Sequence, residues 1–151
     1  MERLTLTLLA LLIGLPLLQA QNVEADFGWM NGLWKGSGWV MDPQTRETTE
    51  FLQFEDIEFG AGNTVVIIQG TGKDVETKEV VFSAAGLLFW DREVKSCKIH
   101  AFTQRDGGVI ADIDLKEPGF FTWGFDVPGG RVEYDVDARN GTRVEQGFFK
   151  P

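Results

Sequence analysis

The chain has 151 residues, with 14 Lys and Arg against 23 Asp and Glu and a formal net charge of -9 at pH 7. Such an acidic chain repels phosphate backbones and anionic membrane surfaces, so we expect no nucleic-acid partner. Its single cysteine, Cys97, cannot form an internal disulfide, and the fold must therefore be held by its core.

The first 20 residues have the pattern of a secretory signal peptide. Arg3 precedes an apolar run from Leu4 to Leu18, Pro16 interrupts this run, and Ala20 supplies a small residue before the expected cleavage site. The run is shorter than the roughly 20 apolar residues of a membrane-spanning helix. We therefore expect a signal peptide at residues 1–20, a single domain at residues 21–151, a secreted or periplasmic location, and no stable membrane insertion after cleavage.

A short helix is predicted around residues 23–31, and the rest of the chain has the rhythm of strands and turns. Runs rich in Val, Ile, Phe, Trp and Thr are separated by turn signals at Asp42-Pro43, residues 60–63, residues 70–72, Gly86, residues 106–108, Pro118-Gly119, residues 128–130 and Asn140-Gly141. No later segment has sustained helical spacing of apolar residues. The pattern predicts an all-β domain of about ten strands, either a sandwich or a barrel.

Alternation assigns the faces of the later strands. Each has a set of apolar residues on one face, which we expect to point inward: Val109, Ala111, Ile113 and Leu115; Phe121, Trp123 and Phe125; and Val132, Tyr134, Val136 and Ala138. Asn140-Gly141 predicts a two-residue hairpin turn between the last two strands. Successive hairpins of this kind form an antiparallel meander.

Residues 32–39, GLWKGSGW, predict the opening strand. Trp34, Gly36 and Gly38 share one face of it, and glycines inside a strand mark sharp bends of the kind that a closing barrel needs. Gly32 and Trp34, after a short helical lead-in, resemble the Gly-x-Trp opening of lipocalins and the wider calycin barrels. In that family the tryptophan plugs the closed end, often under an arginine from a late strand. The resemblance implies a barrel-closing role for Gly32, Trp34 and Arg143, although Arg131 and Arg139 are also available.

The chain is more similar to the uncharacterised, secreted calycin-like barrel proteins of bacteria. Their pattern is matched by Gly32 to Gly38, by Gly86 to Trp90-Asp91, and by Asp106-Gly107, so that the resemblance spans most of residues 27–149. It implies a single antiparallel up-and-down β-barrel of about 8–10 strands with a short N-terminal helix. Nitrobindin-type haem barrels are a related family, but their iron-binding histidine lies near the carboxyl end, and this chain has no histidine after His100. We expect no cofactor and no metal.

The aromatic residues exceed what the core of one domain needs, which favours a barrel that encloses a small, largely hydrophobic ligand. The candidate ligand-binding residues are Trp39, Phe54, Trp90, His100, Phe102, Trp123, Phe125 and Tyr134. The alternative is a filled barrel that acts as a structural or protein-interaction module of the cell envelope. An enzymatic function would depend on scattered carboxylates such as Glu55, Asp56 and Glu58, which form no recognisable catalytic constellation.

Three local patterns invite other chemistry. Cys97 and His100 are three residues apart on a strand and so lie on opposite faces, which predicts a small buried thiol rather than a nucleophile. Residues 70–74, GTGKD, lack the spacing of a phosphate loop and predict a hairpin turn. The carboxylates of Asp112, Asp114, Glu133, Asp135 and Asp137 predict a solvated outer face in which lysines or register offsets separate like charges.

Overall fold

The computed structural model describes residues 23–42, 45–104 and 107–151. Its helical part is α1 (Val23–Phe27) followed directly by one turn of 3-10 helix, η1 (Gly28–Met30), as predicted for residues 23–31. The expected signal peptide at residues 1–20 lies outside the described residues. Among the described residues, no helix has the length and apolar character needed to span a bilayer.

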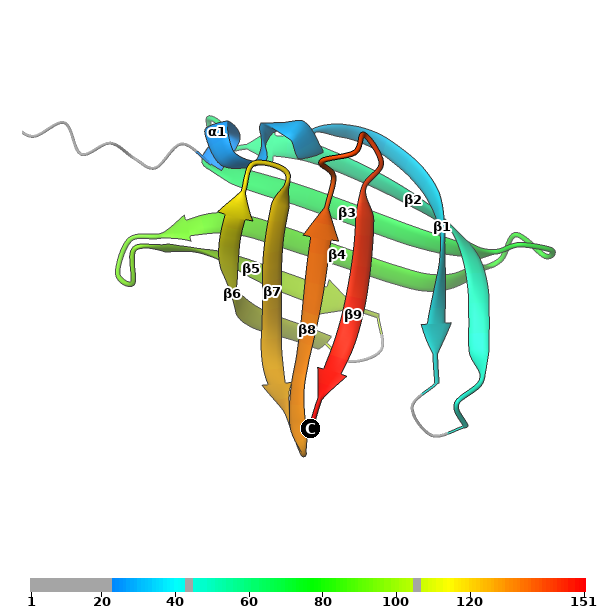
Figure 1. Cartoon of the computed structure of the whole chain (residues 1–151). Coiled ribbons are helices and arrows are strands. Elements are labelled where there is room, and N and C mark those ends of the chain that lie inside the picture. The colour runs from blue at the N-terminus through cyan, green and yellow to red at the C-terminus, as the bar shows by residue number, and fades with distance from the viewer. Residues whose placement is uncertain (1–22, 43–44, 105–106) are drawn as a thin grey trace, which may run out of the picture.

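Nine strands follow in the described residues, and each pairs antiparallel with its neighbours in sequence. Their bounds are β1 (Gly32–Met41), β2 (Thr48–Gly60), β3 (Val65–Asp74), β4 (Val80–Asp91), β5 (Ser96–Thr103), β6 (Gly107–Glu117), β7 (Phe120–Val127), β8 (Gly130–Asp137) and β9 (Val144–Lys150). The sheet curls into a half-barrel, so that β6 to β9 cross in front of β3 and β4 (Figure 1). The predicted fold class, an all-β antiparallel up-and-down β-barrel of about 8–10 strands with a short N-terminal helix, is confirmed, and the sheet has the form of a half-barrel. In the described part of the chain, β1 and β9 are the two borders of the sheet.

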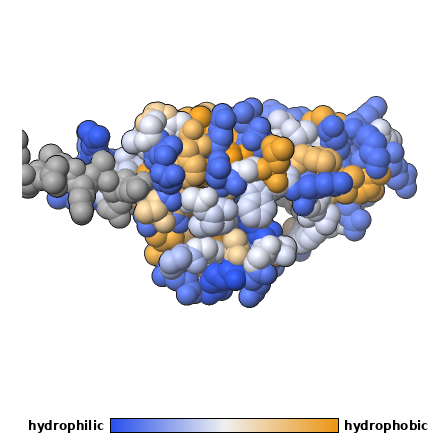
Figure 2. Space-filling model, turned by 90° about the horizontal axis from the view of Figure 1, so that it is seen from above, coloured by the Kyte–Doolittle hydropathy of each residue, from blue (hydrophilic) through white to orange (hydrophobic). Residues whose placement is uncertain are grey.

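The core fills the concave face at the end of the curl that carries α1 (Figure 1). Phe27 and Met30 are fully buried there, and the ring of Phe27 meets the ring of Phe121 edge to face at 5.5 Å. Val66 and Leu88 complete the centre of the cluster from β3 and β4. Seen from this end, hydrophobic and hydrophilic residues are interspersed and the outline is indented between two lobes (Figure 2).

The predicted faces of the later strands agree with the structure except at Leu115, which is 37% exposed, and at Ala138, which lies after the end of β8. Ala111, Ile113, Phe121 and Val136 are buried in the core cluster, and the intervening Asp112 and Asp114 are exposed. On β5, Cys97 and Ile99 are buried, as expected for the core set of that strand. Because side chains alternate along a strand, His100 and Phe102 point to the convex face.

Two glycine signals that predicted turns lie inside strands instead. Gly72 belongs to β3, where a β-carbon would lie 2.9 Å from the ring of Phe51, and Gly86 belongs to β4, where it would lie 3.5 Å from Ile68. The prediction of a hairpin at residues 70–74 is therefore wrong. At Gly72 the absent side chain makes room for a ring packed on the concave face rather than reversing the chain.

The true reversals differ in length. Pro118-Gly119 and Pro128-Gly129 are two-residue connections, and the glycines adopt positive φ angles of 83° and 90°, which side chains disfavour. Asn140-Gly141 lies between β8 and β9, but the connection runs over residues 138–143. The prediction of a two-residue turn there is therefore wrong. The longer loop includes Arg143, whose side chain forms an ion pair with Glu55 of β2.

Candidate functional site

A row of aromatic rings lines the concave face of β7 and β8. Trp123 and Tyr134 are direct cross-strand partners, and their rings stack with centroids 4.5 Å apart and planes 13° apart. Phe125 continues the row along β7, with its ring 6.1 Å from that of Trp123. The ring of Tyr134 also covers Gly147 on β9, where a β-carbon would lie 2.8 Å from it. The row therefore reaches the β9 border of the sheet.

A polar cluster lies at the end of this row and links opposite sides of the curl. Arg143, directly before β9, pairs with Glu55 of β2 and with Glu145 of β9, the latter at 3.1 Å. Gln53 donates to Glu55 over 3.1 Å, and the indole nitrogen of Trp123 donates to Glu145 over 3.3 Å. A continuous chain of hydrogen bonds thus runs from β2 to the aromatic row on β7.

Arg143 and Glu55 are largely shielded from water, whereas the side chain of Glu145 is 34% exposed, and the cluster carries one more negative than positive charge when both carboxyls are ionised. The side chain of Arg143 is 10% exposed and that of Glu55 is 13% exposed. Loss of solvation raises the pKa of Glu145, the nearby charge of Glu55 adds to this, and Arg143 opposes it. Desolvation disfavours the charged form of Arg143, but its two carboxylate partners outweigh it and raise the pKa of the guanidinium. Arg143 is therefore a permanent cation in this environment.

Some polar atoms of the cluster have no protein partner. The side-chain oxygen of Gln53 and the Nε of Arg143 are buried and make no hydrogen bond within the described residues. The indole nitrogen of Trp29, in η1, is in the same state. A buried polar atom without a partner costs about 1–3 kcal/mol, so these atoms favour an additional donor or acceptor from water or a bound molecule. Burial also raises the pKa of the Tyr134 phenol, followed by the charge of Glu145, so this hydroxyl stays protonated at neutral pH.

The structure brings together Trp34 and Arg143, two of the three residues with a predicted barrel-closing role. Gly32 begins β1 with a φ of 130°, and the indole nitrogen of Trp34 donates to the carbonyl of Met30 over 2.7 Å. The guanidinium of Arg143 lies 6.0 Å from the centre of the Trp34 ring. Arg131 and Arg139, which the sequence also offered, make their ion pairs on other parts of the sheet.

The sequence-predicted ligand residues divide between the two faces of the sheet. Trp90, Trp123, Phe125 and Tyr134 share the parity of the core residues in their strands. The others lie on the convex face: Trp39, which is 64% exposed, Phe54, His100 and Phe102. A molecule bound inside the curl cannot touch both sets, so the interior site excludes this second group.

The convex aromatic residues occupy separate places. Phe54 lies between Lys35 and Lys73, whose ammonium groups are 5.7 Å and 5.6 Å from the ring centre, and the groove around it has a volume of about 370 Å³. The rings of His100 and Phe102 contact each other at 4.0 Å. Phe102 lines a second shallow groove, of about 340 Å³, over β3 to β5.

Sequence reasoning missed Gln53 and Glu145 as site residues, and it considered Glu55 only as a scattered carboxylate for an enzymatic function. A signal for Gln53 and Glu55 was present, because both share the parity of Phe51 and Ile57 and so place polar groups on an otherwise apolar face. Glu145 had no local signal, since its strand has no buried residue to set the face.

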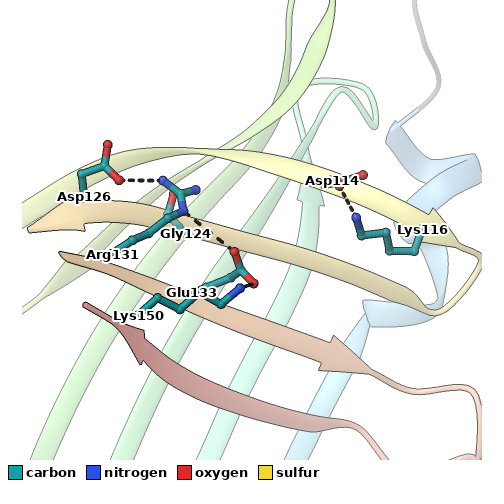
Figure 3. Close-up of polar contacts among 7 residues, drawn as sticks. All are labelled: Asp114, Lys116, Gly124, Asp126, Arg131, Glu133 and Lys150. Carbon is teal, nitrogen blue, oxygen red and sulfur yellow. Dashed lines mark hydrogen bonds and ion pairs between the residues drawn. The ribbon is translucent and has the colours of Figure 1, made fainter.

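The acidic residues of the outer face are separated by basic side chains, as the sequence predicted. Lys98 pairs with Asp112 at 3.2 Å, and Lys116 pairs with Asp114. On the neighbouring strands, Arg131 forms an ion pair with Asp126 at 3.0 Å and donates a hydrogen bond to the carbonyl of Gly124 (Figure 3). Lys150 forms an ion pair with Glu133. Across residues 23–42, 45–104 and 107–151, no group of three or more His, Cys, Asp or Glu side chains is arranged to hold a metal ion.

Cys97 is a buried free thiol. Desolvation, with a smaller contribution from the charge of Asp26, raises its pKa to about 11. The group is therefore a neutral thiol at physiological pH and a poor nucleophile, because the thiolate is the reactive form. This agrees with the predicted structural role of the residue.

In comparisons with known proteins, no family model matches the chain, nor does any curated protein or solved structure. The resemblance to calycin-like barrels stays a prediction. The functional argument therefore depends on the geometry of the concave face.

Proposed function

We propose that the protein is a non-enzymatic binding protein that holds a small, largely hydrophobic molecule against the concave face. The observation that carries the proposal is the meeting of an aromatic row, Trp123, Tyr134 and Phe125, with a buried polar cluster that has unpartnered atoms. Ligand sites in proteins are typically concave and mostly apolar, with a few fixed polar groups. The concave face supplies both the aromatic row and the buried polar atoms, whereas the two grooves of about 370 Å³ and 340 Å³ lie over the convex face.

The energetics favour a ligand with a substantial apolar part. Burying about 300 Å² of its apolar surface contributes about 7.5 kcal/mol, before the cost of association is subtracted. The polar cluster then orients the molecule, because the side-chain oxygen of Gln53 accepts a hydrogen bond and the Nε of Arg143 donates one. A hydroxyl or amide group on the ligand satisfies both.

The test is binding of a neutral hydrophobic fluorophore, N-phenyl-1-naphthylamine, followed by its fluorescence and by native mass spectrometry after incubation with a lipid extract. We expect saturable binding of the fluorophore and retained ligand mass. Phe125→Ser places a hydroxyl in the aromatic row and should weaken binding of the fluorophore about tenfold, which corresponds to about 1.4 kcal/mol.

The matched control is Phe102→Ala on the convex face, which should leave the affinity within a factor of about two. Circular dichroism checks that both variants fold. Absence of any saturable binding, or an equal loss in both variants, would contradict the proposal.

We also propose that the chain is exported, on the strength of the signal-like pattern at residues 1–20. Expression with the native amino terminus in a bacterial host should give an exported protein whose intact mass corresponds to a chain beginning near Gln21. Recovery of the uncut chain from the cytoplasm would contradict this part of the proposal.

A further inference from the structure

The border strand β1 is unusually apolar for the edge of a sheet. Leu33 is 84% exposed, Trp39 is 64% exposed, and Val40 and Met41 are exposed by 41% and 43%. An edge strand presents unpaired backbone N–H and C=O groups, and proteins commonly protect such edges with charges, prolines or bulges. β1 has a single charged residue, Lys35, and no proline, and it pairs with β2 over its whole length without a register shift.

The strand is also self-complementary when it is turned end for end. In an antiparallel pair centred on Ser37, each Ser37 faces its counterpart, Lys35 faces Trp39 of the second copy, and Leu33 faces Met41 of the second copy. Apolar side chains then oppose apolar ones, and the charged residue opposes an aromatic ring.

We propose that β1 is a self-association surface, through which two copies of this chain pair antiparallel about a twofold axis at Ser37. Backbone hydrogen bonds between the two β1 strands supply the affinity, as in other interfaces formed by strand addition. The side chains on the convex face supply the register. The interface is isologous, so each contact occurs twice.

Lys35 favours this register over its neighbours. Its ammonium group already lies 5.7 Å from the ring centre of Phe54 on β2, and in the pair it also reaches Trp39 of the second copy. Centring the axis on Lys35 itself would set two lysines opposite each other, which is destabilising. Centring it on Gly36 or Gly38 would set Lys35 opposite Ser37 or Met41, and the contact between the ammonium group and the indole would be lost.

A second copy fits this edge better than an unrelated partner, because the complementarity is internal to the strand. An isologous pair needs no second surface, so it closes at two copies and does not extend into a fibre. The association does not depend on ligand binding, because the residues that set the register lie on the convex side of the sheet and the aromatic row lies on the concave side.

The first experiment is sedimentation equilibrium of the purified protein and of two variants at Trp39. We expect a monomer–dimer equilibrium at protein concentrations of up to about 100 µM, near the weak end of specific association. Trp39→Lys creates two lysine–lysine contacts across the axis and should weaken the dimer at least about tenfold. Trp39→Glu replaces the same exposed ring but faces Lys35 with an opposite charge, and it should remain within about threefold of the unchanged protein.

The second experiment tests the register by disulfide formation, which needs α-carbons about 4.4–6.8 Å apart. Ser37→Cys should give a covalent dimer without reductant, whereas Leu33→Cys and Met41→Cys should cross-link only when the two variants are mixed. Cys97 does not interfere because it is buried in the core.

A protein that stays monomeric throughout the concentration range would overturn the proposal. Equal weakening by Trp39→Lys and Trp39→Glu would also overturn it, as would cross-linking of Leu33→Cys with itself, since the predicted register keeps its two copies far apart. Trp39 is exposed, so these substitutions leave the core intact, and circular dichroism verifies this for each variant.

Discussion

Arg143 and Glu55 are 88 residues apart in the chain and form an ion pair that joins the entrance of β9 to β2. In the described strand order β1 and β9 are the borders of the sheet, so this contact links regions that the backbone ladder leaves separate. Both side chains are largely shielded from water, which strengthens their attraction and makes the loss of either partner costly. The ion pair therefore stabilises the curled form of the sheet and is also part of the candidate site.

Replacing Arg143 with methionine should strongly destabilise the protein. The apolar substitute preserves much of the side-chain volume but leaves Glu55 and Glu145 without their cation. Breaking a buried ion pair by removing one partner costs about 3–5 kcal/mol. The measurement is the free energy of unfolding from urea titration at neutral pH.

The control for this substitution is Arg139→Met in the loop before β9. Arg139 also pairs with carboxylates, Glu117 and Asp137, but its side chain is 40% exposed. Solvent-exposed pairs contribute about 1 kcal/mol or less. Equal destabilisation by the two variants would show that the ion pairs of Arg143 contribute no more to stability than the exposed pairs of Arg139.

Truncation of Leu88 tests which face of β4 carries the core. Leu88 is fully buried, and Leu88→Ala should lower the free energy of unfolding by about 2–5 kcal/mol through lost burial and the cavity left behind. Its neighbour Leu87 is 39% exposed on the opposite face, so Leu87→Ala should cost about 0.5 kcal/mol. Urea titration of the two variants gives the comparison, and the reverse order of stability would contradict the observed faces.

Much of the fold was predictable because the strands obey local rules. Alternation of Ala111 and Ile113 with Asp112 and Asp114 identified both the strand and its buried face. The glycine signals were less informative, because a glycine also serves where a neighbouring ring needs space. Gly72 under Phe51 has this role, and no local pattern distinguishes it from a turn glycine.

The candidate site was less predictable than the fold. Trp34 and Trp39 are five residues apart on one strand, so alternation already places them on opposite faces, and only one of them can face the interior. The face that becomes concave is decided by packing between distant strands. The ion pair between Arg143 and Glu55 is of this kind, because nothing near either residue in the sequence indicates the other.

Cys97 should be unreactive in the folded protein. Its pKa of about 11, raised mainly by burial, leaves very little thiolate at pH 8, and its burial restricts access by reagents. We expect iodoacetamide to modify the native protein at least about a hundred times more slowly than the urea-unfolded protein. Intact-mass spectrometry follows the reaction, and similar rates in the two states would contradict a buried thiol.

Asp137 should contribute to the loss of stability in acid. The side chain of Arg139 and then its backbone N–H donate hydrogen bonds to Asp137, which lowers the pKa of that carboxyl from 3.8 to about 2. A carboxyl whose pKa is lower in the folded state binds fewer protons there, so its contribution to stability is present above the unfolded value and is lost as the pH falls toward about 2.

Asp137→Asn removes this contribution. The difference in urea midpoint between the unchanged protein and the variant should therefore be constant above about pH 5, decrease as the pH falls through 3.8, and level off below about 2. Arg139→Met removes the side-chain donor and should abolish most of the same pH-dependent difference. A difference between the unchanged protein and Asp137→Asn that stays constant down to pH 2 would show that the two side chains are not coupled in solution.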